Sequence, residues 1–413
     1  MIPLPIEEVR PLGRVEARDD EITGVKIDSR RVEPGDLFVA IRGGADFLDQ
    51  ALAAGAAATL VPDDDFAAMA SLGRAVRNLS EADVVGITGS TGKTSTKDIL
   101  AALVNPQRRT IAAQASYNAE LGVPLTLCRI ERDTELLIAE LAMRGFGQIA
   151  ELCAMARPTV GVITAIGPVH LEFVESVAGV ARAKAELLEA LPRGSKAVVP
   201  AGVPELDPYL RADLEILRVG EDVRLVSFED GRLEADVAGE LVELDLPFTA
   251  RHQAENTLTA LAAYAALGLP LDRVHEGAGR IRLSSLRGEE LPLPGGGVLI
   301  NDCWNANPTS MAAALRNLAA RRNGGRRIAV LGGMAELGPN GPRYHREIGG
   351  MTAGLDAVVG VGELARDYRP THWVADADAA ATLLSELLEP GDIVLVKGSR
   401  AVGLERVAEN ITA

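Results

Sequence analysis

The chain has 413 residues, of which 47% are hydrophobic, 3% aromatic and 24% charged. This composition is typical of a folded chain and excludes wholesale disorder, and at roughly 100–200 residues per domain the length predicts two to four domains. The 58 acidic and 42 basic side chains give a net charge of −16, which disfavours duplex nucleic acid and anionic membranes as main partners but not a nucleotide, whose phosphates need only one positive pocket.

The sequence favours a cytoplasmic chain without membrane insertion. Cys128, Cys153 and Cys303 are too few and too scattered for a disulfide framework or a zinc site, which favours plain thiols in a reducing compartment. The N-terminus has no basic start followed by an apolar run, so no signal peptide is expected. The most apolar stretches, such as 51–60 and 258–271, are Ala-rich and too short or too polar-flanked to span a bilayer.

The N-terminal segment is expected to form a small α/β unit. Runs at 25–28, 36–41 and 59–62 are strand-like, and residues 49–55 are expected to form a helix closed by glycine. The acidic, Ala-rich segment 63–80 is interpreted as a linker, because the pattern changes after it.

From Asp83 onward, near-continuous apolar strands alternate with helices, which is typical of a buried parallel sheet. The expected strands are 84–88, 135–141, 160–166 and 196–199, and the expected helices are 93–103, 177–191 and 255–267. Residues 219–248 alternate with period two, which predicts antiparallel strands appended to that sheet.

A third series predicts another doubly wound α/β unit. Its expected strands are 298–302, 327–331, 357–361 and 392–396, and its expected helices are 310–320 and 377–388. The whole chain is therefore expected to be an α/β protein of three domains, 1–82, 83–284 and 285–413. The second is expected to resemble a P-loop ATPase sheet and the third a Rossmann-like sheet.

A phosphate-binding loop is predicted at Gly89-Ser-Thr-Gly92-Lys93-Thr94, between a strand and a helix. The glycines let backbone N–H groups point at phosphate, Lys93 can neutralise the β- and γ-phosphates, and the Thr94 hydroxyl can ligate Mg²⁺. The spacing is not the strict P-loop, because Ile87 stands where the first glycine is expected. The alternative is a glycine-rich turn that only caps the helix.

Three further residues become informative only in combination. Glu140 closes a strand, where a carboxylate would face the phosphates and hold a metal. His170, which follows the strand 160–166, would by itself be interpreted as a surface histidine. Lys184 would by itself be interpreted as a solvated helical lysine. Their order along the chain after the phosphate loop is what gives them weight.

These residues belong to a series of ordered blocks that resembles the Mur ligase family. The blocks are Ser116-Tyr-Asn118-Ala-Glu-Leu-Gly-Val-Pro124, Glu140-Leu-Ala-Met-Arg-Gly145, Thr164-Ala-Ile-Gly-Pro-Val-His170-Leu-Glu172, Ala181-Arg-Ala-Lys184-Ala-Glu186, Arg251-His252-Gln-Ala-Glu-Asn256 and Asn301-Asp302-Cys-Trp-Asn305-Ala-Asn307-Pro308-Thr-Ser-Met311. The resemblance runs from about residue 28 to 406. The blocks 331–338, 345–349 and 396–400 most resemble the member that adds D-alanyl-D-alanine.

The resemblance implies an ATP-dependent, ADP-forming ligase that uses Mg²⁺. It implies that the enzyme joins D-alanyl-D-alanine to a UDP-MurNAc-tripeptide through an acyl phosphate, in peptidoglycan synthesis. The implied partners are these small molecules, and the implied oligomeric state is a monomer. The N-terminal domain would hold the UDP end of the substrate.

The resemblance also implies roles for individual residues. Those matching catalytic residues are Lys93, Lys184, His170, Asn118 and Arg287. Those matching metal ligands are Thr94, Glu140, His170 and Lys184, the last as a carbamate. Those matching ATP contacts are Gly89, Ser90, Thr91, Gly92, Lys93, Thr94, Ser95, His252, Asn256, Arg287, Asp302 and Asn305.

The assignments on the substrate side leave alternatives open. Ser29 and Arg30 are candidate contacts of the UDP end, or part of a plain turn with an exposed arginine pair. Lys397, Ser399 and the loop 334–338 are candidate contacts of the dipeptide. Asp302 could instead be a local cap.

Several family positions are altered, which leaves a second hypothesis open. The altered positions are the shortened loop 42–47, Ala119, Ala165, the segment 200–204, Asn301, Trp304 and Gly333. A paralogue that joins a different acid and amine is therefore an alternative, and a non-catalytic nucleotide-binding scaffold is a third. Because ATP and the substrate are both anionic, positive charge is expected at a cleft around Lys93, Arg30 and Arg287.

Overall fold

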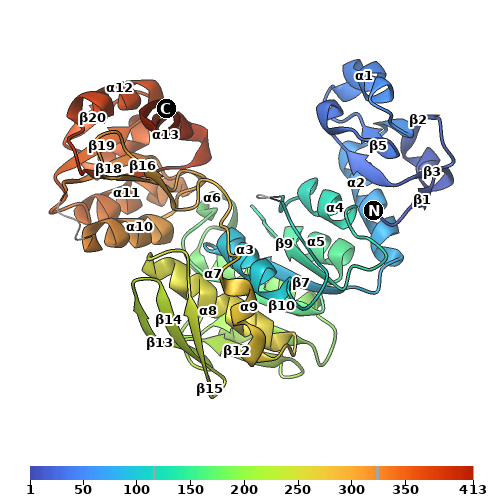
Figure 1. Ribbon diagram of the computed structural model, residues 1–413, viewed down its shortest axis with the longest axis horizontal. Helices are drawn as coiled ribbons and strands as arrows, with labels where there is room; N and C mark the ends of the chain where they lie inside the picture. The colour runs from blue at the N-terminus through green and yellow to red at the C-terminus, as the bar shows by residue number, and fades with distance from the viewer. Residues whose placement is uncertain (115–116, 322–324, 413) are drawn as a thin grey trace.

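The computed structural model describes residues 1–114, 117–321 and 325–412, so Ser116 of the block 116–124 lies outside the described residues. Three lobes follow one another along the chain, and each is built on its own sheet (Figure 1). The sheets have four, nine and six strands, and a two-stranded ribbon of β1 (Leu4–Pro5) and β3 (Glu21–Ile22) lies in the first lobe. The expected three-part α/β fold is confirmed.

The N-terminal lobe has the strand order β2-β6-β5-β4. Its elements are β2 (Gly13–Ala17), β4 (Gly24–Lys26), β5 (Asp36–Val39), α1 (Leu48–Ala53) and β6 (Ala58–Pro62). β4, β5 and β6 are parallel, and β2 closes the edge in antiparallel register. Three of these strands and the helix agree with the sequence patterns.

The interpretation of 63–80 as a linker was wrong, because this segment forms the helix α2 (Asp65–Asn78). The Asp64 side chain caps it by accepting hydrogen bonds from the backbone N–H groups of Phe66 and Ala67 at 2.9 and 2.8 Å. Met69, Leu72 and Val76, spaced three and four apart, form its buried face. The alanines that suggested a linker are strong helix formers, and the acidic residues belong to the cap.

The central lobe has the strand order β15-β14-β13-β12-β11-β10-β7-β9-β8. Its strands are β7 (Asp83–Thr88), β8 (Thr110–Ala112), β9 (Leu136–Glu140), β10 (Val160–Ile163), β11 (Lys196–Pro200), β12 (Glu215–Val219), β13 (Val223–Glu229), β14 (Arg232–Val237) and β15 (Glu240–Asp245). β7 to β12 pair in parallel, and β13 to β15 form the expected antiparallel extension.

Helices cover both faces of the central sheet and complete two separate cores. They are α3 (Lys93–Val104), α4 (Gly122–Leu127), α5 (Gln148–Ala156), α6 (Leu171–Val174), α7 (Val177–Ala190), α8 (Arg251–Ala266) and α9 (His275–Ala278). α3 packs on α8 and α5 packs on α7. No helix in the described ranges is long and apolar enough to cross a membrane.

The C-terminal lobe has the strand order β16-β17-β21-β18-β19-β20. Its strands are β16 (Glu289–Pro292), β17 (Val298–Asn301), β18 (Arg327–Gly332), β19 (Ala357–Val361), β20 (His372–Val374) and β21 (Ile393–Lys397). Its helices are α10 (Pro308–Ala320), α11 (Gly341–Gly350), α12 (Ala377–Leu387) and α13 (Glu405–Thr412). All strands but β16 run in parallel, as the doubly wound pattern predicted.

The topology brings the predicted site residues to one edge of the central sheet. β7, β9 and β10 are adjacent and parallel, so their carboxyl ends share an edge, and the phosphate loop, Glu140 and the segment leading to His170 follow those ends. The C-terminal lobe lies beside this edge (Figure 1). The connection between the lobes is anchored where Ser284 donates its backbone N–H to Asp98 of α3 at 2.7 Å.

Candidate active site between the central and C-terminal lobes

The phosphate loop is packed so closely that a side chain at either of its two glycines would displace a neighbouring side chain. Gly92 has φ 79°, and a Cβ there would lie 2.3 Å from Oδ1 of Asn256. A Cβ at Gly89 would lie 1.9 Å from Oγ1 of Thr164. The loop therefore combines backbone geometry with contacts from α8 and from the segment after β10, which a simple capping turn would not need.

Lys93 and Thr94 begin α3, at the positive end of the helix dipole. The Lys93 amine folds back and donates to the carbonyl of Gly89 at 2.7 Å. Burial lowers the pKa of Lys93, Glu140 opposes that shift, and Arg287 adds to it. Thr94 and Ser95 are buried at the start of the same helix.

The segment after β10 is held against the phosphate loop. Ser90 donates its backbone N–H to the carbonyl of Ala165 at 2.8 Å, and its hydroxyl accepts from the backbone N–H of Gly167 at 3.0 Å. The hydroxyl of Thr164 donates to the carbonyl of Thr91 at 2.5 Å. These bonds fix the position of the chain that continues to His170.

Glu140 is a buried carboxylate with an unused oxygen. Its side chain is 1% exposed, and Oε1 accepts a hydrogen bond from Nδ2 of Asn118 at 2.7 Å. Oε2 is buried without a hydrogen-bond partner among the described residues. Because a buried, unpaired carboxylate oxygen is costly, and because Mg²⁺ prefers oxygen ligands, Glu140 and the Thr94 hydroxyl fit a magnesium ion.

His170 lies at the lobe junction and not on the free surface. It has φ 53° and precedes α6. Its Nδ1 lies 2.5 Å from Oε2 of Glu336, a residue of the C-terminal lobe, and Oε1 of Glu336 pairs with Nε of Arg144 at 3.2 Å. Burial lowers the pKa of His170, although Glu336 opposes that shift.

Lys184 is buried inside the central lobe, so its interpretation as a solvated lysine was wrong. The side chain lies on α7 and is 1% exposed. Burial moves its pKa well below the ordinary lysine value, and the charge of Lys93 lowers it further. Glu186 has a different role, because its carboxylate accepts the backbone N–H groups of Gly147 and Ala150 at the start of α5, at 2.7 and 3.1 Å.

Arg287 reaches the phosphate loop from the beginning of the C-terminal lobe. Its Nη2 donates to Oγ1 of Thr94 at 3.1 Å, and its carbonyl accepts from Nε2 of Gln253 at 3.3 Å. Its guanidinium carbon lies 5.7 Å from the ring centre of Trp304. Burial lowers the pKa of Arg287, although three carboxylates oppose that shift.

The predicted nucleotide contacts come from both lobes. His252 and Asn256 lie on α8, and Nδ1 of His252 is buried without a hydrogen-bond partner within the described ranges. Asn256 donates to Oε1 of Gln253 at 2.8 Å. From the C-terminal lobe, Asn307 caps α10 through its Oδ1 and donates Nδ2 to the carbonyl of Ser90 at 3.3 Å.

Lys397 and Ser399 act within the C-terminal lobe. Lys397 is 2% exposed, and its amine donates to Oδ2 of Asp302 at 2.8 Å and to the carbonyl of Asn305 at 3.0 Å. The hydroxyl of Ser399 accepts the backbone N–H of Ala335 at 2.9 Å. Both residues therefore hold loops that face the central lobe, and Asp302 is an ion-pair partner.

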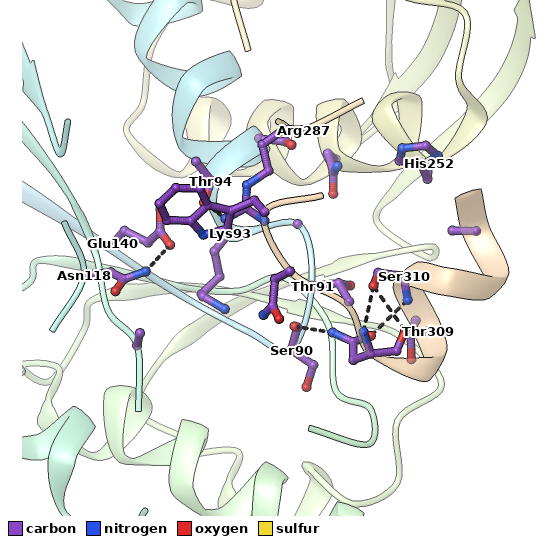
Figure 2. A pocket seen from close by; sticks show the side chains of 18 of the residues that line it. Ser90, Thr91, Lys93, Thr94, Asn118, Glu140, His252, Arg287, Thr309 and Ser310 are labelled. Carbon is purple, nitrogen blue, oxygen red and sulfur yellow. Dashed lines mark hydrogen bonds between the residues drawn. The ribbon is translucent and has the colours of Figure 1, made fainter. Parts of the chain in front are cut away.

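A cavity of ≈ 540 Å³ brings most of these groups together (Figure 2), whereas Gly89, Lys184 and Ser399 are not among its lining residues. Its predicted lining residues are Ser90, Thr91, Gly92, Lys93, Thr94, Ser95, Asn118, Glu140, His170, His252, Asn256, Arg287, Asp302, Asn305 and Lys397. Its unpredicted lining residues include Arg144, Gln148, Gln253, Trp304 and Arg316. Most of these residues lie within or beside the ordered blocks, so their position relative to those blocks could have identified them. Arg316, on α10, lies outside the blocks, and nothing in the sequence pointed to it.

Ser29 and Arg30 do not line this cavity. They lie in the N-terminal lobe, where the hydroxyl of Ser29 donates to Oε1 of Gln50 at 3.0 Å. Arg30 forms a double hydrogen bond with Asp28 and holds the pKa of that carboxyl at about 2. The cavity's own cations are Lys93, Arg144, Arg287, Arg316 and Lys397, and four carboxylates line it as well, so two of the three expected cations, Lys93 and Arg287, lie at the cleft and Arg30 does not.

Comparison with known proteins agrees with this architecture. Family models match the Mur ligase family catalytic domain at residues 21–104, the Mur ligase middle domain at 87–264 and the Mur ligase glutamate ligase domain at 287–400. The UDP-N-acetylmuramoyl-tripeptide–D-alanyl-D-alanine ligase of Synechocystis is 32% identical over 96% of this chain and 93% of its own. The chain belongs to the Mur ligase family.

Two solved structures extend the likeness of this Mur ligase to three dimensions. MurF from Acinetobacter baumannii superposes with a TM-score of 0.86 at 26% identity, covering 99% of both chains. MurF from Thermotoga maritima, solved with ADP, superposes with a TM-score of 0.81 at 28% identity, covering 94% of this chain and 97% of its own. The three lobes and their order are therefore the same as in these two solved structures.

Proposed function

We propose that this Mur ligase joins D-alanyl-D-alanine to UDP-N-acetylmuramoyl-tripeptide in peptidoglycan precursor synthesis, converting ATP to ADP and phosphate. Its relatives in Synechocystis and Acinetobacter baumannii are named for that ligation. The observation that carries the proposal is the cavity at which Lys93, Glu140 and His170 of the central lobe meet Arg287 of the C-terminal lobe.

The reaction requires activation of a carboxylate, because an oxide is a poor leaving group. A carboxylate oxygen attacks the γ-phosphorus of ATP, the bond to the β,γ-bridging oxygen breaks, and ADP leaves behind an acyl phosphate. The neutral amine of the dipeptide then attacks the acyl carbon. The tetrahedral intermediate expels phosphate, and the nitrogen loses a proton. Lys93 and Arg287 are placed to stabilise the anionic phosphoryl oxygens in the first step.

The three lobes divide this work. The segment 1–82 is proposed to hold the UDP end near Ser29 and Arg30, 83–284 to bind ATP, and 285–413 to close over the nucleotide with Asp302 and Asn305. Closure would exclude water from the acyl phosphate, which hydrolysis would otherwise consume. We expect a monomer, which light scattering can test.

Mg²⁺ is the proposed metal. Thr94, Glu140 and His170 are the residues that would hold it, in agreement with the unpaired buried oxygen of Glu140. When bound, the ion neutralises the phosphate oxygens of ATP. The protein's own part is to present these oxygen and nitrogen ligands in a site that closes on the nucleotide.

Lys184 is proposed to be carbamylated. Burial, with the charge of Lys93, lowers the pKa of Lys184 and so favours its neutral amine, whose nitrogen can attack CO₂, form a C–N bond and release one proton. The product is a carboxylate-like group in place of the amine. This change would let Lys184 serve as a further metal ligand beside Glu140.

Lys184→Ala tests that role. We expect the variant to lose about 10²-fold or more of kcat, on the order of the cost of removing one catalytic electrostatic group, and formate or acetate to restore part of the activity by replacing the missing carboxylate. Full activity without added anion would contradict the carbamate role. Alanine at Glu186, which caps α5, should not be rescued by the same anions.

One assay separates the proposed function from its alternatives. The purified protein is given ATP, Mg²⁺, UDP-MurNAc-tripeptide and D-alanyl-D-alanine, and phosphate release is measured. Release that requires both substrates supports the proposal. Release only with other acid–amine pairs would identify a paralogue with a different substrate, and ADP binding without turnover on a broad panel would identify a scaffold.

A further inference from the structure

Glu336 is a carboxylate of the C-terminal lobe with both of its side-chain partners in the central lobe. Its Oε2 lies 2.5 Å from Nδ1 of His170, and its Oε1 pairs with Nε of Arg144 at 3.2 Å. Its backbone carbonyl also accepts the N–H of Glu172, just beyond His170, at 3.4 Å. The contact therefore exists only when the two lobes are docked.

The loop that carries Glu336 is held firmly by its own lobe. The backbone N–H of Met334 donates to Nε2 of His345 at 2.9 Å, and that of Ala335 donates to the hydroxyl of Ser399 at 2.9 Å. Glu336 has φ 59°, a left-handed conformation that non-glycine residues keep only where surrounding contacts impose it. The carboxylate is thus presented to the central lobe from a defined position.

The chemistry of this contact determines the tautomer of His170. An ionised carboxylate only accepts hydrogen bonds, so when Glu336 is ionised and the His170 ring is neutral, this contact places the ring proton on Nδ1. Nε2 then keeps its lone pair, and His170 lines the cavity that also contains Glu140 and Thr94. Metal-binding histidines commonly donate their other ring N–H to a carboxylate, which orients the ring and fixes its tautomer.

We propose that Glu336 is a positioning residue that holds His170 in the Nδ1–H tautomer, with Nε2 available to a divalent cation. The metal site of the central lobe is therefore completed by the C-terminal lobe, and only in the docked arrangement. This inference rests on the metal-ligand role of His170 in the proposed function. The metal site would then be ready to bind its ion only when the two lobes are docked.

The first test measures Mn²⁺ affinity of the protein–ADP complex by electron paramagnetic resonance, without turnover. Glu336→Ala should bind Mn²⁺ about 10–100-fold more weakly, the usual cost of losing the partner of a ligating histidine. Glu336→Gln should lose less Mn²⁺ affinity than Glu336→Ala, because the amide oxygen of glutamine can still accept a hydrogen bond from Nδ1–H of His170. Glu347→Gln, which changes an exposed carboxylate paired with Arg343 on α11, is the matched control and should bind as the wild type does.

A second test asks whether Glu336 acts through His170. His170→Ala should weaken Mn²⁺ binding. Adding Glu336→Ala to the His170→Ala variant should not weaken Mn²⁺ binding further. Since the chain has five histidines, ¹⁵N spectra of labelled protein can assign the His170 tautomer by difference from His170→Ala. The wild type should show Nδ1–H, and Glu336→Ala should lose that preference.

Three results would overturn the inference: unchanged Mn²⁺ affinity in Glu336→Ala, an equal loss from Glu336→Ala when His170 is already absent, or an Nε2–H tautomer in the wild type. A failure of the proposed function can be distinguished from a failure of this inference, because ligation of D-alanyl-D-alanine is assayed separately on the wild type. A wild type that does not ligate but shows the expected Mn²⁺ and tautomer results would retain the inference and reject that substrate.

Discussion

At the scale of single residues, burial changes what ordinary side chains can do. Lys184 would be a solvated cation on an exposed helix face, but enclosure in the central lobe lowers its pKa well below the usual lysine value. Glu140 is equally enclosed and keeps one oxygen without a partner among the described residues. Both side chains are costly to bury, and buried ionisable groups of this kind are common at functional sites.

Lys184→Met should make the ligand-free protein more stable near neutral pH. The folded pKa of Lys184 is lowered, so between that value and about 10.4 the unfolded chain binds a proton that the native chain does not, and wild-type stability rises with pH through this window. Methionine removes that dependence. Thermal unfolding in CO₂-free buffers should show a gain in midpoint near pH 7 that shrinks towards about pH 10. A gain that is independent of pH would contradict the assignment.

At the scale of elements, α10 both supports the C-terminal lobe and contacts the phosphate loop. Its N-cap, Asn307, accepts the backbone N–H of Ser310 through Oδ1, and its Nδ2 donates to the carbonyl of Ser90. The two halves of one amide therefore have separate roles. The capping interaction stabilises the helix, and the second hydrogen bond joins the C-terminal lobe to the central lobe.

Substitutions of Asn307 should separate these two roles. Asn307→Ser keeps a capping oxygen but is too short to reach Ser90, so we expect near wild-type stability and a raised KM for ATP. Asn307→Ala should show the same kinetic change and lose about 1 kcal/mol of stability as well. Urea unfolding and steady-state kinetics measure the two effects. A serine variant as unstable as the alanine variant would show that capping is not the structural role.

At the scale of the whole molecule, the site exists only between lobes. The central lobe supplies the phosphate loop and Glu140, whereas Arg287, Asn307 and Glu336 enter from the C-terminal lobe. Five cationic and four acidic side chains line the cavity, so its charge balance differs from the net charge of −16 of the whole chain. The average charge of the chain therefore does not describe the site.

Trp304 should report nucleotide binding at this junction. The chain has two tryptophans, and Trp304 lines the cavity near Arg287, whereas Trp373 lies on β20 and stacks on Arg366. In Trp373→Phe, ATP with Mg²⁺ should change the remaining emission in a saturable way. In Trp304→Phe, which is the matched control, the emission of Trp373 should not respond. The reverse pattern would place the nucleotide elsewhere.

Much of the fold could be predicted because its strands are buried on both faces, so their apolar runs stand out, and because glycines and capping residues mark their ends. Helix α2 was not predicted, because alanines and acidic residues are also typical of linkers. The sequence alone does not show that Met69 and Leu72 are buried against the rest of the protein. Most cavity residues could be named from ordered motifs. The pairing of Glu336 with His170 could not, because 166 positions separate the two residues along the chain.

The sequence by itself determined many of the buried strands and several helices, the phosphate loop and the family resemblance, since these depend on local periodicity, spacing and motif order. Only the tertiary structure decided that Lys184 is buried, that Lys397 holds Asp302 within its own lobe, that Arg30 lies away from the cavity, and that Glu336 meets His170. Burial and contact between lobes depend on which faces pack together, and packing joins residues that no local pattern relates.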